Sequence, residues 1–337
     1  MVRRAGKEAS RLPKKKIGFY WASACGGCEV AVLDIDENIL KVAELADIFM
    51  WPVAMDYKFS DLEAMKDGEF DAVFFNGAIR NDEEEHLANL FRKKSKVLVA
   101  FGACSCFGGI PSLANLYSIG DLLNRAYLEA PSNDNPDKIL PQPKFSVEEG
   151  EITIPTMYNR VKTLNQVVDV DYYIPGCPPT PEQITDAVLT LLTKAPPEKG
   201  HFFAGEKTLC DTCEREKSDK SITEFKRLHL TPPEEIDNTK CLLEQGIICL
   251  GPITRSGCDN RCINANMPCR GCFGPAPYVS DMGAKFISAL GSIEAADDEE
   301  TAKKMAEQFY DPAGTLYRFT LSLSLLRGNI KTEERTE

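Results

Sequence analysis

The sequence predicts an α/β fold, in which a parallel sheet covered by helices is followed by a loop-rich second domain. Two observations lead to this prediction. Over the first 195 residues, short apolar segments alternate with amphipathic stretches, as strands and helices do in a parallel sheet. Between residues 200 and 280 this pattern stops, and eight of the 13 cysteines fall there among turns. With 337 residues, the chain is long enough to form two hydrophobic cores.

Five segments of the first domain have the composition of buried strands, and three have helical periodicity. The strands are expected at residues 16–21, 47–55, 71–79, 96–104 and 170–177. The helices are expected at residues 27–46, 82–95 and 180–194. Asn81 and Thr180 stand where helix N-caps are favoured, and Pro181 suits a first helical position. Residues 129–165, rich in Pro, Asn and Glu, are expected to form a long surface excursion.

Changes in composition divide the chain into an arm and two domains. The predicted division is a disordered basic arm at 1–14, a first domain at 15–197 and a second at 198–337, with "KAPPEKG" (194–200) as the linker. Because residues 200–280 show little apolar periodicity, bound metal is expected to organise them. A helical pattern returns at 281–310, and the mixed apolar stretch 317–328 is expected to complete the fold.

The charge of the chain excludes some classes of partner. The net charge is −12, although the first 16 residues carry seven Lys or Arg and one Glu. An acidic body of this kind argues against nucleic acid as a partner. No apolar run is long enough to span a bilayer, and no apolar region follows Arg3 and Arg4 as it would in an export signal. We therefore expect a cytoplasmic protein with no membrane partner.

The cysteines indicate metal–thiolate sites. In a reducing compartment, 13 cysteines favour metal binding or redox chemistry over disulfides, and the three histidines are too few for imidazole sites. Four cysteines follow predicted strands, whose carboxyl ends meet at one edge of a parallel sheet: Cys25, Cys28, Cys104 and Cys177. Four thiolates there would hold a 4Fe–4S cluster or a zinc ion. Cys106 is an alternative to Cys104, and a redox dithiol at Cys25 and Cys28 is a third, weaker interpretation.

The remaining eight cysteines suffice for two further four-thiolate sites. By sequence order, one site would take Cys210, Cys213, Cys241 and Cys249, and the other Cys258, Cys262, Cys269 and Cys272. Structural zinc remains an alternative at this spacing. Three such sites, one of them at a sheet edge that binds ligands, suit an electron-transfer chain better than three structural zinc ions.

The motifs "ACGGCE", "GAC", "PGCPPTPEQI", "CDTC", "CLLEQGIICLGP" and "NMPCRGCFGP" occur in this order within residues 15–275. In this combination the chain resembles the small subunits of nickel–iron hydrogenases, most closely the cytoplasmic methyl-viologen-reducing type that couples to heterodisulfide reductase. The resemblance implies a flavodoxin-like first domain. In this domain the proximal cluster is held by the four cysteines expected at the sheet edge, Cys25, Cys28, Cys104 and Cys177. The resemblance also implies a medial and a distal cluster in the second domain, which makes three clusters in all.

Two departures from the family pattern concern the cluster ligands. Many members have a distal histidine where this chain has Cys210, and a proline near the position of Cys262 beside a 3Fe–4S cluster. With thiolates at both positions, all three clusters can be 4Fe–4S and their potentials would be low, which suits anaerobic electron flow. Glu29, beside Cys28, is expected to be a helix-start carboxylate favoured by the dipole, with a proton-transfer role as the alternative.

The resemblance also implies the partners. They are a nickel–iron large subunit that splits hydrogen, a small 2Fe–2S electron-transfer subunit and the flavoprotein subunits of heterodisulfide reductase, in a setting of methanogenesis and electron bifurcation. Electrons would pass from the cluster at the sheet edge through the medial cluster (258–272) to the distal cluster (210–249). No catalytic residue is expected in this chain. The alternatives are a quinone-reducing-complex subunit, a deazaflavin-reducing hydrogenase subunit and a zinc-stapled scaffold or assembly module.

Overall fold

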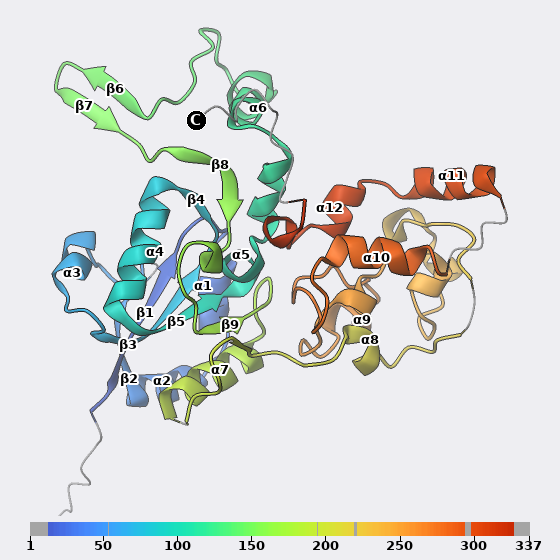
Figure 1. Ribbon diagram of the computed structural model, residues 1–337, viewed down its shortest axis with the longest axis horizontal. Helices are drawn as coiled ribbons and strands as arrows, with labels where there is room; N and C mark the ends of the chain where they lie inside the picture. The colour runs from blue at the N-terminus through green and yellow to red at the C-terminus, as the bar shows by residue number, and fades with distance from the viewer. Residues whose placement is uncertain (1–12, 53, 194, 219–220, 294–297, 327–337) are drawn as a thin grey trace, which may run out of the picture.

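The structure is a computed structural model that describes residues 13–52, 54–193, 195–218, 221–293 and 298–326. Figure 1 shows two lobes side by side, one built around a sheet and the other from short helices and loops. Nearly all of the predicted basic arm, and the end of the predicted 317–328 stretch, lie outside the described residues. Within the described part, no helix combines the length and apolar character needed to cross a membrane.

The first lobe contains a six-stranded sheet in which every pairing is parallel. Its strands are β1 (Lys15–Trp21), β2 (Ala46–Met50), β3 (Phe70–Asn76), β5 (Ser95–Phe101), β9 (Tyr172–Ile174) and β10 (His201–Phe202). They lie in the order β2-β1-β3-β5-β9-β10. The first five strands therefore follow the flavodoxin-like order, which confirms the predicted fold class.

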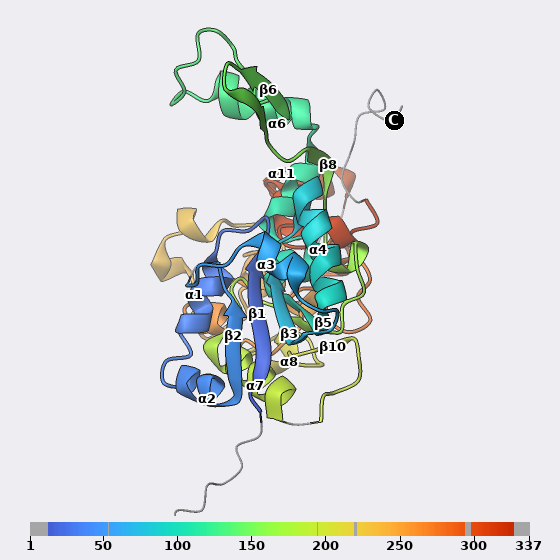
Figure 2. The same ribbon diagram turned by 90° about the vertical axis from the view of Figure 1, so that its left-hand side faces the viewer.

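Helices cover both faces of the sheet, as a parallel sheet requires. One face packs against α1 (Gly27–Leu33), α2 (Asn38–Leu45) and α7 (Pro181–Thr193), and the other against α3 (Phe59–Ala64) and α4 (Asp82–Lys94). Phe74 belongs to the first core and Phe75 to the second, because successive side chains of a strand point to opposite faces. Figure 2 shows α2 and α4 on opposite sides of the strands.

The predicted helix caps are present. The side chain of Asn81 accepts a hydrogen bond from the Glu84 amide at 2.8 Å, and the hydroxyl of Thr180 accepts one from the Gln183 amide at 3.3 Å. Pro181 is the first residue of α7. These caps satisfy amides that the first helical turn leaves without partners.

Several predicted elements are shorter than their apolar patterns. The helix expected at 27–46 is two helices, because Asp36 takes a left-handed backbone conformation (φ 51°) between them. The strand expected at 47–55 ends at Met50, two residues before Pro52, which has no amide proton for a strand ladder. The strand expected at 170–177 spans only Tyr172–Ile174.

The strand expected at 96–104 also ends early, and this changes the setting of a cysteine. β5 stops at Phe101, and a short helix, α5 (Gly102–Phe107), follows it directly. Cys104 therefore lies on this helix and does not end the strand. In the same way, the segment expected at 71–79 divides at Gly77 (φ 97°) into β3 and the separate β4 (Ile79–Asn81).

The predicted surface excursion has structure of its own. It contains a hairpin of β6 (Lys144–Val147) and β7 (Gly150–Thr153), which projects from the sheet lobe in Figure 1, and β8 (Met157–Lys162), which pairs antiparallel with β4. The preceding helix is α6 (Ile119–Asn124).

The second lobe has short elements around an apolar core. Its helices are α8 (Leu209–Thr212), α9 (Arg261–Asn264), α10 (Met282–Leu290), α11 (Glu299–Gln308) and α12 (Pro312–Leu316). Buried Phe286, Met305 and Leu316 pack against Leu242 and Ile247 of the cysteine-rich segment. Residues 200–280 thus contribute more to a core than their weak periodicity predicts, because the apolar residues of α10–α12 complete it.

The end of the described chain connects the two lobes. Phe319 packs in the core of the sheet lobe, and the Ser322 hydroxyl donates to the Val161 carbonyl at 2.6 Å. Two residues later, the Ser324 hydroxyl donates to the Asp281 carboxylate at 2.9 Å. β10 also extends the first lobe's sheet beyond the predicted boundary at 197/198. The exact domain boundaries remain a prediction.

Asp171 gives a prediction about acid stability. Its carboxylate is buried and bonds Arg92 and Lys199, each at 2.6 Å. Burial alone would raise the pKa of Asp171, but the hydrogen bonds from Lys199 and Arg92 outweigh it and lower that pKa. The pKa of an Asp in the unfolded chain is about 3.9. Because the pKa of Asp171 is lower in the folded protein, its carboxylate stabilises the fold at pH values above about 3.9. This stabilisation is lost as the pH falls through the folded pKa.

We therefore expect Asp171→Asn to reduce the free energy of unfolding by about 3 kcal/mol at pH 7. The difference from wild type should shrink below about pH 4. Asp47→Asn, which removes an exposed ion pair with Lys14, is the control and should cost less than about 1 kcal/mol. Urea unfolding at several pH values measures both, and equal losses would contradict the assignment.

Candidate metal centres

The cysteines expected at the sheet edge come together there. We call Cys25, Cys28, Cys104 and Cys177 the crest group. Cys25 and Cys28 follow β1, Cys104 lies on α5 after β5, and Cys177 follows β9. The Ala103 amide donates to the Gly176 carbonyl at 2.7 Å, which holds the start of α5 against the loop that carries Cys177.

Glycine is required where the crest thiols approach the backbone. A Cβ atom at Gly102 would lie 2.4 Å from the Sγ of Cys28, and one at Gly109 would lie 2.4 Å from the Sγ of Cys104. Both glycines also have positive φ, at +85° and +59°. The thiols therefore occupy space that side chains at these two positions would fill.

The crest thiols influence one another electrostatically. Burial raises the pKa of Cys28, and the neighbouring thiols of Cys104, Cys177 and Cys25 raise it further. Burial likewise raises the pKa of Cys104 to about 12, with additional contributions from Cys177 and Cys25. Four thiolates this close repel one another, so deprotonating them together requires a bound cation.

Cys106 lies in a different environment from Cys104. Its side chain is buried in the core between α5 and the sheet, where the thiol is 3.4 Å from the carbonyl oxygen of Ala100, to which it donates. Burial raises the pKa of Cys106 well above its usual value. The thiol of Cys104 contacts a small cluster around Ala78 and Val161. This geometry favours Cys104 as the crest residue.

Glu29 is more deeply buried than a helix-start carboxylate at the surface would be. Only 1% of it is exposed, and neither carboxylate oxygen has a hydrogen-bond partner among the described residues. Burial raises the pKa of Glu29 to about 7, an effect that nearby Trp51 and Asn76 reduce. A favourable interaction with the helix dipole therefore does not account for the burial of Glu29. The sequence pattern gives no indication of this burial.

The other eight cysteines form two groups in the second lobe. We call Cys258, Cys262, Cys269 and Cys272 the middle group, and Cys210, Cys213, Cys241 and Cys249 the outer group. Burial raises the pKa of Cys210 to about 12, and Cys249, Cys241 and Cys213 each add to the increase. Burial raises the pKa of Cys272 to about 12 as well, with contributions from Cys258 and Cys262.

Two contacts connect the three groups in series. Cys272 of the middle group lies close to Cys177 of the crest group. Burial is the largest cause of the raised pKa of Cys272, the charge of Cys258 is the second and the charge of Cys177 is the third. At the other end, the Cys269 amide donates to the Sγ of Cys249 at 3.3 Å. Residues of the middle group therefore contact both the crest group and the outer group.

The donor sets consist of sulfur ligands. All twelve grouped side chains offer sulfur, the ligand that iron–sulfur clusters and zinc accept. Among the described residues, no three Cys, His, Asp or Glu side chains converge closely enough to hold one metal ion.

These features define a class of protein. It has a flavodoxin-like domain with a group of metal-binding thiols at the sheet edge, and further thiol groups follow in a second lobe. A family model described as "NADH ubiquinone oxidoreductase, 20 Kd subunit" matches residues 25–191, which include the whole crest group. Relatives that match almost the whole chain define its family more narrowly.

Two relatives establish this family. The chain is 39% identical over 312 residues to the iron–sulfur subunit of the F420-non-reducing hydrogenase of Archaeoglobus profundus, covering 91% of this chain and 96% of the relative. It is 36% identical to the corresponding subunit of the F420-non-reducing hydrogenase of Methanothermobacter thermautotrophicus, covering 95% and 98%. The chain belongs to the family of small subunits of F420-non-reducing nickel–iron hydrogenases.

The chain is accordingly one component of an oxidoreductase, whose catalytic site lies on the large subunit. Among solved structures, a crystal structure of an NAD+-reducing [NiFe]-hydrogenase in the H2-reduced state matches with a TM-score of 0.47 and 28% identity, over 56% of this chain and 97% of that one. The family model covers only the first lobe, whereas the two hydrogenase relatives cover both, which counts against a quinone-reducing-complex subunit.

The close approach at Gly102 gives a prediction. Gly102→Ala should lower the free energy of unfolding by about 1–2 kcal/mol for backbone strain and about 1–3 kcal/mol more for the contact with Cys28. Gly68→Ala is a matched control, because Gly68 also has positive φ (+67°) but its nearest neighbour would be 3.8 Å away. Denaturant unfolding measures both variants, and equal losses would show that Cys28 is not packed against Gly102.

Proposed function

We propose that this chain relays electrons between the hydrogen-splitting large subunit and a further redox partner, through three 4Fe–4S clusters held by the crest, middle and outer groups. The observation that carries the proposal is the arrangement of twelve thiols as three groups of four in series. Bound in these groups, each cluster would accept and release one electron at a time.

The residues of this chain would hold the clusters and adjust their potentials. Burial and repulsion from neighbouring thiols raise the pKa values of Cys28 and Cys104, so iron would displace the protons of these thiols on binding. Backbone amides near the sulfurs, such as that of Cys269 beside Cys249, would reduce the negative charge on the thiolates and raise a cluster's potential. An all-thiolate ligand set acts in the opposite direction and favours low potentials.

The arrangement of the thiols in series favours iron–sulfur clusters over structural zinc. Three neighbouring groups of sulfur ligands suit electron transfer better than three separate structural zinc ions would. The description of the Archaeoglobus relative as an iron–sulfur subunit supports the same choice.

The crest is the face we assign to the large subunit. Cys25 and Cys177 are exposed there, although a cluster in this position would need protection from solvent. Apolar side chains near the crest cysteines are exposed as well. Trp21 (39% exposed) precedes Cys25 at the end of β1, Val30 (56%) follows Cys28 on α1, and Ile110 (51%) has its backbone amide at the Cys104 thiol. A partner that covers this rim would bury the apolar surface and bring its own redox centre next to the crest group.

The exit side is proposed by family resemblance. We assign the outer group to the exit because the middle group separates it from the crest. The acceptor would be a small 2Fe–2S subunit that leads to the flavoprotein subunits of heterodisulfide reductase, in an anaerobic, cytoplasmic setting.

The cluster assignment predicts the metal content. Protein purified without oxygen should be brown and contain about twelve iron atoms, four for each cluster, with a matching amount of acid-labile sulfide. Colorimetric iron and sulfide assays and metal analysis measure this directly. A colourless protein with stoichiometric zinc and no labile sulfide would instead support the scaffold alternative.

A matched pair of variants tests the crest ligands. Cys104→Ser should remove one cluster, seen as about four fewer iron atoms and the loss of one electron paramagnetic resonance signal. Cys106→Ser should keep the full iron content, because that thiol faces the apolar core. The reverse outcome would assign Cys106 as the ligand.

The exposed apolar residues next to the crest group give a prediction about binding of the large subunit. Val30→Asp should weaken co-purification of the large subunit at least about tenfold, because it places a charge within an apolar interface. Leu40→Asp on α2 is the control, since Leu40 is also exposed (66%) but lies away from the crest thiols. Unchanged pairing in Val30→Asp would move the large subunit to another face.

A further inference from the structure

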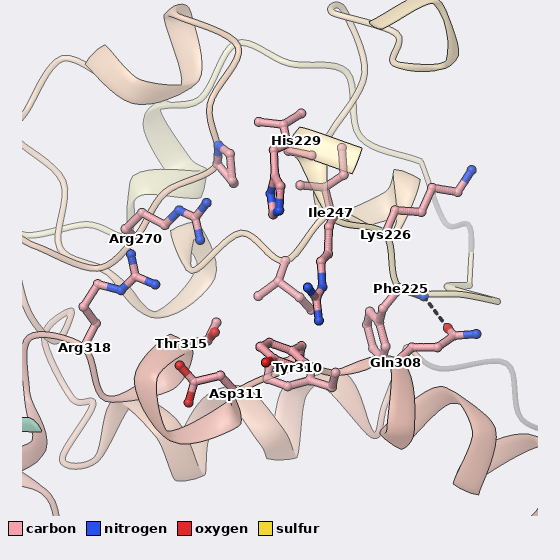
Figure 3. Close-up of a pocket in the computed structure, with 15 residues that line it drawn as sticks. Phe225, Lys226, His229, Ile247, Arg270, Gln308, Tyr310, Asp311, Thr315 and Arg318 are labelled. Atoms are coloured by element: carbon pink, nitrogen blue, oxygen red, sulfur yellow. Dashed lines mark hydrogen bonds between the residues drawn. The ribbon is translucent and has the colours of Figure 1, made fainter. Parts of the chain in front are cut away.

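A pocket in the second lobe lies outside the three thiol groups. It lies between residues 225–229 and the segment from the end of α11 to just beyond α12, and its volume is about 360 Å³. Figure 3 shows its positive side, where the guanidinium groups of Arg270 and Arg318 turn toward each other. Phe225, Tyr310 and Ile247 line another side of the pocket. The pocket is therefore cationic at one end and largely apolar at the other.

The arginines of this pocket lack acidic partners. No carboxylate of the described residues forms an ion pair with Arg227, Arg270 or Arg318, although acidic residues outnumber basic ones by 51 to 39 in the whole chain. Lys226, by contrast, pairs with Glu224 at 3.0 Å. Three arginines line this cavity without a carboxylate partner among the described residues, which leaves positive charge that a bound anion can balance.

Intramolecular contacts hold these arginines in place. The Nε of Arg318 donates to the Gly314 carbonyl at 3.1 Å, and the guanidinium of Arg227 lies 3.8 Å from the centre of the Tyr310 ring. The acidic lining residue, Asp311, uses its carboxylate to accept the Gly314 amide at 2.9 Å, as the N-cap of α12. The positive groups are therefore positioned before any ligand arrives, which reduces the cost of binding.

Proximity to the thiols explains only one of the arginines. Arg270 lies near Cys249, Cys262 and Cys269, so its charge also balances thiolates of the middle and outer groups. Burial lowers the pKa of Arg270, and the charge of Arg318 lowers it further, which shows how close the two guanidinium groups are. No such thiol contact is found for Arg318 in the described structure, so counterbalancing the clusters does not account for it.

We propose that this pocket binds the phosphate group of a small ligand, no larger than a mononucleotide, between Arg270 and Arg318. Planar guanidinium groups form paired hydrogen bonds with phosphate oxygens, and a convergent pair is a suitable receptor for one phosphate. The cavity is larger than inorganic phosphate alone needs, and its aromatic and apolar walls offer space for an attached ring. The proposal concerns binding alone and does not depend on the electron-transfer assignment.

Calorimetric titration of the full-length protein, purified without oxygen, tests this site. The probes are inorganic phosphate, AMP and adenosine. We expect phosphate and AMP to bind and adenosine not to bind, because the phosphate makes the charged contacts. Tighter binding of AMP than of phosphate identifies a nucleotide as the ligand, and equal binding identifies free phosphate; either result supports the site.

Arg318→Gln is the variant of choice. No thiol contact of Arg318 is found among the described residues, so its loss should leave the iron content unchanged. It should weaken phosphate binding about tenfold or more, the value of a charge-assisted hydrogen bond. Arg318→Lys should restore part of the affinity, and Lys304→Gln, which removes a surface charge on α11, should have no effect. Absence of binding at millimolar concentrations, equal binding of adenosine and AMP, or unchanged affinity in Arg318→Gln would overturn the proposal.

Discussion

The structure depends on one constraint: β1, β5 and β9 must end at the same edge of a parallel sheet. This register brings cysteines separated by 149 positions, from Cys28 to Cys177, into one crest. Gly102 then permits the final approach, because any side chain there would occupy the position of the Cys28 sulfur. The buried aromatic side chains on both faces, such as Phe74 and Phe75, keep the strands in this register.

The second lobe depends on the first in a similar way. The final described segment packs Phe319 into the sheet lobe and bonds Ser324 to Asp281 of the second lobe, so the two lobes are connected at both ends of the cysteine-rich segment. This connection keeps Cys272 near Cys177, and the short contact between Cys269 and Cys249 extends the series. A relay needs its centres at fixed short separations, and the rigid packing of the two lobes would supply them.

The sequence was sufficient to predict the α/β architecture. Alternating apolar segments and strand-end cysteines are local signals, so the parallel sheet and the crest could be predicted. Features that depend on tertiary packing could not: the helix α5 beneath Cys104, the two-residue strand β10 and the burial of Glu29 have no periodic signature. The pairing of Arg270 with Arg318 was equally hidden, because residues 48 positions apart meet only in the folded second lobe.

The most direct test of the relay is electron paramagnetic resonance of the hydrogen-reduced complex, with this chain and its large subunit together. If the three groups hold clusters in series, the spectrum should show magnetic interaction between neighbours, with the middle cluster coupled to both others. Cys272→Ser, which should remove the middle cluster, should then abolish the magnetic coupling of both the crest and the outer clusters while their own signals persist. Three isolated signals, or a signal from one cluster only, would contradict the series arrangement.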